Sequence, residues 1–192
     1  MYKRQGTLRV EVAGGTVWMD MAPPKLLQTL PQDALGELYA AYGLTESDRP
    51  AELPVEIIST GLADIMMPVR DRETLLRAVQ DETAVTALSR RFDVTGVHMF
   101  CLGDKTCTAW CSNFAPLYDI PEECATGTSN GALVYYLYRH GLVELDKVYT
   151  VVQGEKMGRP SMISAQVILK DGQPFVKVGG PAVTLVRGEI EL

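Results

Sequence analysis

The pattern of hydrophobic and polar positions in this chain changes its period several times. Residues 7–12 and 16–20 alternate between apolar and polar on either side of Gly14-Gly15, which predicts a β-hairpin. Pro23-Pro24 then ends the second strand. Other short apolar runs bounded by turn residues predict further strands at 55–59, 63–69, 94–102, 107–114, 148–153, 162–169, 174–178 and 182–186.

Helical spacing is confined to a few segments. Residues 32–42 carry apolar side chains three and four positions apart and end at Gly43. Asp71 and Asp81 each begin a further helix, with acids in the first turn and arginines later. Residues 132–138 are apolar or aromatic nearly all the way round, which is typical of a buried helix. Many strands and one buried helix predict an α+β fold in which the sheet curls around a central helix.

The run Glu122-Glu123-Cys124-Ala125-Thr126-Gly127-Thr128-Ser129-Asn130-Gly131 places two acids ahead of the predicted central helix. Thr128 or Ser129 could cap this helix, and its free amides favour a carboxylate or a phosphate. Acids beside such an anion cradle suggest acid/base chemistry on a small carboxylic acid. Ordinary capping and turn chemistry would use the same residue types.

Composition and charge narrow the function classes. The net charge is −6 over 192 residues, so the chain has no excess of basic residues and no nucleic-acid partner is expected. The apolar stretches are far shorter than a bilayer span and no secretory signal is evident, so we expect no membrane partner and a cytoplasmic location. Four cysteines and two histidines form no zinc pattern, so no metal site is predicted and buried, reduced thiols are expected.

Several segments, taken in order, resemble the phenazine-biosynthesis PhzF-like family, whose fold is similar to that of diaminopimelate epimerase. The resemblance covers nearly everything after residue 5. The matching segments are Gly6-Thr7-Leu8-Arg9-Val10 with Val17-Trp18-Met19-Asp20, Phe114-Ala115-Pro116-Leu117-Tyr118-Asp119-Ile120, the run from Glu122, Gln153-Gly154-Glu155-Lys156-Met157-Gly158-Arg159-Pro160-Ser161, and Val178-Gly179-Gly180-Pro181-Ala182-Val183.

The resemblance implies two similar domains, each a sheet wrapped around a helix, with the active site in the cleft between them. It implies isomerase or epimerase chemistry without a cofactor, often in a homodimer. Glu123 stands where the family usually has an aspartate that holds or relays a proton, and Glu122 is an alternative because glutamate has one more methylene. The substrate carboxylate would be bound at the following segment, which comprises Thr126, Gly127, Thr128 and Ser129.

Three positions depart from the family pattern or leave an alternative open. Cys124 stands where the family often has proline, and its surroundings also resemble the Cys-Gly-Thr-Gly signature of cysteine-dependent racemases, so Cys124 is a further candidate proton carrier. Asp119 replaces the usual glycine, which leaves the shape of that turn open. Arg159 could bind an anion, but a structural ion pair is the simpler expectation.

The family's usual first segment, with its Ser-Glu-Thr glutamate as the main acid/base, does not occur in this sequence. Tyr2-Lys3-Arg4-Gln5 resembles a translated sequencing adapter joined to the family match at Gly6. We therefore expect residues 1–28 to comprise an adapter-like start and a remnant hairpin of a first domain. Residues 29–192 are expected to form one complete second domain, whose last strand could return to the first. Little or no activity is expected from this chain alone; the alternatives are a non-catalytic anion-binding domain and a racemase using Cys124.

Overall fold

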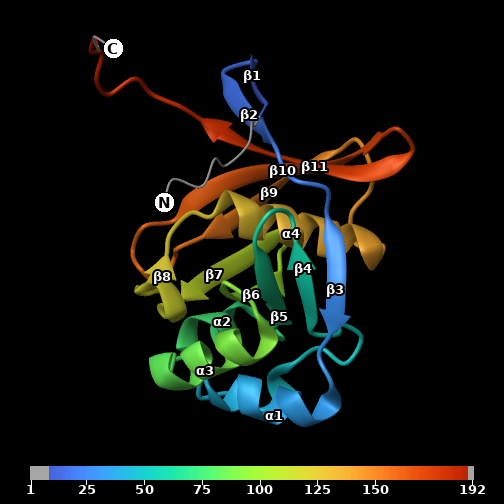
Figure 1. The fold of residues 1–192 in the computed structure, drawn as a ribbon, viewed down its shortest axis with the longest axis vertical. Helices are drawn as coiled ribbons and strands as arrows, with labels where there is room; N and C mark the ends of the chain where they lie inside the picture. The colour runs from blue at the N-terminus through green and yellow to red at the C-terminus, as the bar shows by residue number, and fades with distance from the viewer. Residues whose placement is uncertain (1–8, 190–192) are drawn as a thin grey trace.

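The computed structural model describes residues 9–189, which form an α+β fold built on one large sheet (Figure 1). Its strands are β1 (Val10–Ala13), β2 (Thr16–Asp20), β3 (Lys25–Thr29), β4 (Glu56–Ser59), β5 (Ala63–Pro68), β6 (Gly96–Leu102), β7 (Ala109–Ala115), β8 (Ile120–Glu123), β9 (Val148–Gln153), β10 (Ser161–Lys170) and β11 (Gln173–Pro181). Its α-helices are α1 (Gln32–Ala40), α2 (Arg72–Arg77), α3 (Glu82–Phe92) and α4 (Gly127–Arg139). Within the described residues, no helix combines the length and the apolar character needed to cross a membrane.

The sheet has the strand order β1-β2-β11-β10-β9-β7-β6-β5-β4-β3, and β8 pairs with β7 beside this path. Neighbouring strands are antiparallel except in the pairs β5–β6 and β7–β9. Both ends of the order come from residues 10–29, because the β1–β2 hairpin joins β11 and β3 joins β4. The predicted domain boundary after residue 28 falls inside β3, while Tyr2–Gln5 lie outside the described residues.

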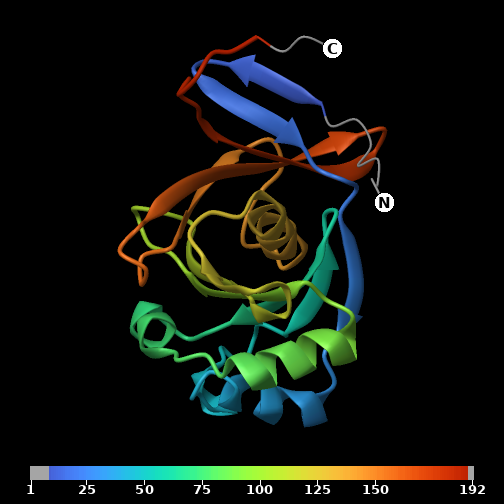
Figure 2. The same ribbon diagram turned by 60° about the vertical axis from the view of Figure 1, so that its left-hand side comes forward.

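Helix α4 is the centre of one of the two hydrophobic cores. Figure 2 shows α4 nearly end on, with the sheet curling around it. Its side chains are buried on most sides, as its apolar sequence predicted. They pack against strands from both halves of the sheet, and the Tyr136 ring meets the Phe100 ring edge-on at 5.3 Å between centroids. The predicted curling of a sheet around a central helix is therefore confirmed.

A second core lies between the other face of β4–β7 and the helices α1, α2 and α3 (Figures 1 and 2). Alternate residues of one strand serve the two cores: Ile65 and Met67 of β5 face α1–α3, whereas Met66 faces α4. Because both faces of these strands are covered, they read as continuous apolar runs in the sequence.

Some predicted elements need correction. The edge strand β3 was not predicted, and residues 182–186 were predicted as a strand but lie outside any strand. Helix α4 begins at Gly127 and its N-cap residue is Thr126, so the prediction of Thr128 or Ser129 as the cap was wrong. The physical reason is that Gln153 already binds the Thr126 amide from outside the helix, which lets the helix start two residues earlier.

The predicted helix starts at Asp71 and Asp81 are confirmed as N-caps. The Asp81 carboxylate accepts hydrogen bonds of 3.0 Å from the amides of Thr83 and Ala84. We expect Asp81→Ala to lower the free energy of unfolding by about 1 kcal/mol, because two amides at the helix start lose their acceptor. Urea denaturation measures this change. Asp81→Asn keeps an acceptor at this position, so an equal loss in both variants would contradict the explanation.

Candidate functional site

The start of α4 presents backbone amides that have no partner inside the helix. The first hydrogen bond to the N-cap carbonyl is made by the Asn130 amide with the Thr126 carbonyl, at 3.2 Å. The amides of Gly127, Thr128 and Ser129 precede it, so they have no helix carbonyl to bind. Gly127 lies against Val178 and the end of the Met19 side chain, and a Cβ at this position would be 3.4 Å from Val178. These amides and the helix dipole favour an anion here.

Glu123 is the acidic side chain held directly at this helix start. It ends strand β8, and its Oε2 accepts a 2.6 Å hydrogen bond from the Thr126 hydroxyl. Both residues are half-buried. The structure thus brings together two of the predicted site residues, with a hydroxyl donating to one oxygen of the carboxylate.

Glu122 lies on the other side of the same strand, because successive side chains of a strand point to opposite faces. Its Oε1 is buried without a hydrogen-bond partner among the described residues. Its charge acts on buried Tyr42, whose pKa is raised chiefly by burial and further by Glu122. Glu122 and Glu123 therefore occupy different environments, and the structure groups Glu123, rather than Glu122, with Thr126.

Cys124 is half-buried and lies against Gly154. A Cβ at Gly154 would be 2.8 Å from the Cys124 Cα, so this close approach requires glycine. The other three cysteines, Cys101, Cys107 and Cys111, are free and buried, as predicted. Burial raises the pKa of Cys101 to about 12, which keeps that thiol protonated.

The two remaining candidates in the first turn of α4 make hydrogen bonds to residues other than Glu123. The Thr128 carbonyl accepts a 2.8 Å hydrogen bond from the Thr60 hydroxyl. Ser129 is buried, and its hydroxyl donates a 2.6 Å hydrogen bond to the Asp64 carboxylate. Burial raises the pKa of Asp64, and this hydrogen bond partly offsets the rise. The Ser129 hydroxyl is therefore already engaged, which leaves only the Ser129 amide without a partner inside the helix.

Two buried amides beneath the site were not predicted from the sequence. Gln153, at the end of β9, binds the Glu123 carbonyl and three groups in the first turn of α4 and its cap. Asn130 donates to the Thr126 carbonyl and to Gln153. The one signal in the sequence is that each is a polar residue at the end of an apolar run or inside a buried helix, where an amide needs partners.

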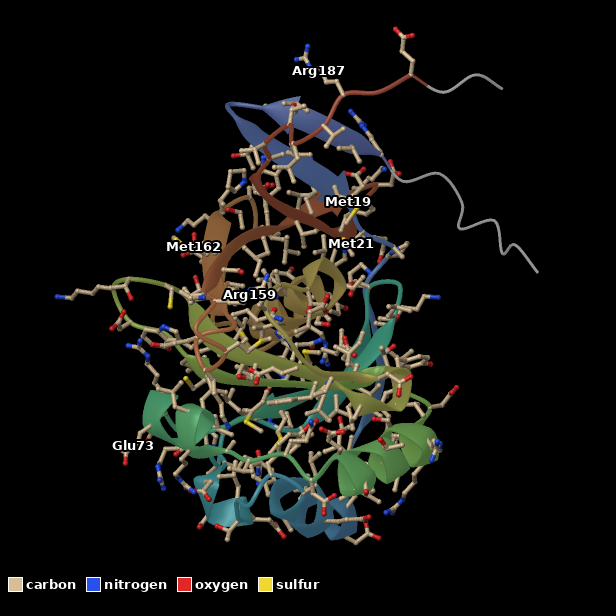
Figure 3. The ribbon with its side chains drawn as sticks, turned by 90° about the vertical axis from the view of Figure 1, so that its left-hand side faces the viewer. Met19, Met21, Glu73, Arg159, Met162 and Arg187 are labelled. Atoms are coloured by element: carbon tan, nitrogen blue, oxygen red, sulfur yellow. The ribbon has the colours of Figure 1, made fainter. Side chains whose placement is uncertain are left out.

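A pocket of about 330 Å³ adjoins the first turn of α4 at Thr128. Its walls come from the end of β2, the segment after it and the turn between β4 and β5, with Met19, Met21 and Leu62 among its apolar residues. Figure 3 shows Met19 and Met21 between the hairpin and α4. Among residues 9–189, no group of three or more histidine, cysteine or acidic side chains could hold a metal ion.

Two further expectations can now be compared with the structure. Arg159 is exposed and makes no ion pair with any described residue, so the expected structural ion pair is wrong (Figure 3). Asp119 has a φ of 60°, the left-handed conformation that favours glycine. Aspartate tolerates this conformation better than most residues do, so the turn keeps a glycine-like backbone.

Comparisons with known proteins agree with this architecture. The chain is 27% identical over 191 residues to an uncharacterized isomerase, YddE, of Escherichia coli O157:H7, covering 97% of this chain and 64% of that protein. It is 30% identical over 158 residues to the trans-2,3-dihydro-3-hydroxyanthranilate isomerase of Pseudomonas fluorescens, covering 81% of this chain and 53% of that protein. The chain thus spans less than two thirds of these relatives.

Solved structures and a family model match nearly the whole chain. A predicted epimerase from Pseudomonas aeruginosa matches with a TM-score of 0.74 and 27% identity, over 95% of this chain and 62% of that one. A PhzF-family protein from Bacillus anthracis matches with a TM-score of 0.77 and 19% identity, over 96% of this chain and 64% of that one. The model of the family described as phenazine biosynthesis-like protein matches residues 3–188, and the chain therefore belongs to the PhzF family.

Proposed function

We propose that this chain carries one half of the active site of an isomerase or epimerase that moves a proton on a small carboxylic acid. The observation that carries the proposal is the 2.6 Å hydrogen bond from Thr126 to the Glu123 carboxylate, beside the free amides of α4. Glu123 is the proton carrier, and the amides of Gly127, Thr128 and Ser129 bind the substrate carboxylate. No cofactor is required for this chemistry. Family membership and relatives named as isomerases support the same reaction class.

The pocket beside Thr128 would receive the body of the substrate. Its walls include Met19, Met21 and Leu62, so an unsaturated or cyclic acid would bury its apolar part there. Glu122 is a weaker candidate for the proton carrier because its side chain lies toward Tyr42 rather than toward α4. Cys124 stays an alternative carrier, since it is half-buried and adjoins Glu123.

Moving a proton from one carbon to another, or between faces of one carbon, takes a base and a donor within hydrogen-bonding reach of the substrate. The family resemblance implies that a glutamate outside this sequence supplies one of these roles. We therefore expect the purified chain to bind small carboxylates but to show little or no turnover. Assembly into a homodimer belongs to the same proposal.

Binding can be tested with 3-hydroxyanthranilate, the aromatic analogue of the acid named for the Pseudomonas relative. In an amide NMR titration, the ligand is expected to shift the resonances of Gly127, Thr128 and Ser129. Gly127→Pro removes one of these donors at a helix position that tolerates proline, so binding should weaken roughly tenfold. Gly127→Ala keeps the amide and serves as the matched control. Equal binding by both variants would contradict the amide cradle.

Turnover is measured with trans-2,3-dihydro-3-hydroxyanthranilate in D₂O, where both product formation and deuterium incorporation are visible by NMR. No turnover above the uncatalysed rate is expected. If the unmodified chain shows turnover that is lost in Glu123→Gln and kept in Glu122→Gln, the expected inactivity is refuted. The same result would support Glu123 as the proton carrier. Loss of turnover on alkylation of Cys124 alone would favour the racemase alternative.

The genomic sequence upstream of Gly6 distinguishes the isomerase from the anion-binding domain. An in-frame Ser-Glu-Thr there supports the isomerase, and a stop codon directly before Met1 supports the anion-binding domain.

A further inference from the structure

The side-chain amide of Gln153 is fully engaged in holding the proposed site. Its Nε2 donates to the Glu123 carbonyl at 2.6 Å and to the Thr126 hydroxyl at 3.0 Å. Its Oε1 accepts from the Thr126 amide at 3.2 Å and from the Asn130 side chain at 2.6 Å. Gln153 is completely buried, so each of its hydrogen-bonding positions is satisfied by protein. Rotating the amide by 180° would oppose acceptor to acceptor at the Glu123 carbonyl, so its orientation is determined.

This orientation determines the direction of the next hydrogen bond. Because the Thr126 oxygen receives a hydrogen from Gln153, its own hydrogen is directed to Oε2 of Glu123, 2.6 Å away. A hydrogen bond from a hydroxyl to an ionised carboxylate is short and strong. One carboxylate oxygen of Glu123 is thus held; under the proposed function, the other exchanges the proton.

Inward from Gln153, the next hydrogen-bonding side chains are those of Asn130 and His98. Both hydrogens of the Asn130 amide are used, on the Thr126 carbonyl and on Gln153. Its Oδ1 has no partner among the described residues, and neither does Nε2 of His98; both atoms are buried. Burial lowers the pKa of His98 to about 4, and hydrogen bonding by Asn113 and Asn130 partly offsets this, so the imidazole is neutral at pH 7 and Asn130 is its neighbour.

A neutral imidazole carries one hydrogen, and its position decides whether these two atoms bind. With the hydrogen on Nδ1, His98 donates to Oδ1 of Asn113 at 2.9 Å, and Nε2 and the Asn130 oxygen are left as two buried acceptors. With the hydrogen on Nε2, His98 has a donor directed to its neighbour Asn130, and a turned Asn113 amide donates to Nδ1. The orphaned atoms are then a donor and an acceptor on neighbouring side chains, which a small adjustment of those side chains would join, although no hydrogen bond links them in the described geometry. Amide orientation is the kind of assignment that the hydrogen-bond network decides.

We propose that three buried residues, His98, Asn130 and Gln153, and half-buried Thr126 form a relay of hydrogen bonds that all donate toward Glu123 and fix its carboxylate. His98 Nε2 donates to Asn130, Asn130 to Gln153, Gln153 to Thr126, and Thr126 to Oε2 of Glu123. The first three are positioning residues, since they act on Glu123 through Thr126. Their role in catalysis rests on the proposed function, whereas the hydrogen bonds of the relay do not depend on it. Successive donors polarise one another, so a change at one end is felt at the other.

The first test is the tautomer of His98, measured by long-range ¹H–¹⁵N correlation on the full 192-residue chain at pH 7. The relay requires the hydrogen on Nε2. A hydrogen on Nδ1 would overturn the His98 end of the proposal. This measurement uses the unmodified protein, so no variant has to fold.

The second test measures whether a change at Glu123, one end of the relay, affects His98 at the other end. Glu123→Gln removes the charge that terminates the relay and should shift the side-chain resonances of Gln153 and the Nε2 hydrogen of His98. Glu122→Gln, on the opposite face of β8, is the matched control and should leave them in place. Thr126→Val should reproduce the shift by removing the hydroxyl at constant shape, whereas Thr126→Ser should restore it. Equal responses to Glu122→Gln and Glu123→Gln would overturn the relay. No ligand is used, so an absence of carboxylate binding would refute the proposed function and leave this result standing.

Discussion

Gly154→Ala is expected to lower the free energy of unfolding by about 3 kcal/mol and to displace the proposed site. Gly154 has a φ of 84°, a conformation that costs roughly 1–2 kcal/mol for a residue with a Cβ. The added Cβ would lie 2.7 Å from the Arg159 carbonyl oxygen and 2.8 Å from the Cys124 Cα. Both are backbone atoms, so relief requires a movement of the chain, which typically costs a further ~1–3 kcal/mol. Cys124 adjoins Glu123, so the movement reaches the candidate proton carrier.

The same loop offers a matched control for this substitution. Gly158 has a φ of 66°, but a Cβ there meets nothing within 4 Å. Gly158→Ala therefore carries the conformational cost alone, about 1 kcal/mol. Urea denaturation of both variants measures the difference, and the amide resonances of Gly127 and Thr128 report on the site. Equal destabilisation by the two alanines would show that the contact with Cys124 is unimportant.

His98 is expected to make the protein lose stability between pH 6.5 and pH 4. Burial lowers its pKa from 6.5 to about 4 in the folded protein. In this interval the unfolded chain binds a proton that the folded protein excludes, so the free energy of unfolding falls as the pH falls. Its contribution is complete above pH 6.5 and lost below about pH 4. At 1.36 kcal/mol per pKa unit, the gap corresponds to about 3 kcal/mol.

The measurement is urea denaturation at several pH values for the unmodified chain and for His98→Gln. Glutamine does not titrate, so the difference in unfolding free energy between the two proteins should change by about 3 kcal/mol across the interval. Carboxylates with lowered pKa values, such as Asp48 and Asp71, contribute to both proteins and cancel in this difference. His140→Gln removes the other histidine of the chain and leaves His98 in place. A difference that stays constant with pH would contradict the burial of a neutral imidazole.

The sequence predicted most elements whose own residues determine them. The buried helix α4 and the hairpin turn at Gly14-Gly15 follow from local apolarity and from residues that adopt positive φ. Strand β3 could not be predicted in this way, because all five of its residues are exposed and its conformation depends on pairing with β4. Residues 182–186 show the reverse: a strand-like pattern does not form a strand without a neighbouring strand to pair with.

The candidate site likewise has one part that the sequence predicted and another that only the fold brings together. The run from Glu122 to Gly131 is contiguous, so its acids and its helix start were visible in the sequence. Which glutamate faces α4 depends on the phase of β8, a strand that was itself not predicted. His98, Asn130 and Gln153 lie on three separate elements, and the sheet order brings them together. Such a relay cannot be recognised from spacing along the chain.

The strand order also has a consequence for synthesis of the protein on the ribosome. The β1–β2 hairpin leaves the ribosome well before its neighbour in the sheet, β11, whose Lys177 lies opposite Asp20. Until β11 arrives, β2 exposes an unpaired edge beside the apolar residues Val10 and Val12. Closing so long a loop is slow, so the nascent chain has a prolonged opportunity for wrong pairing. We therefore expect correct folding in the cell to depend on how long the β1–β2 hairpin is kept from other strands.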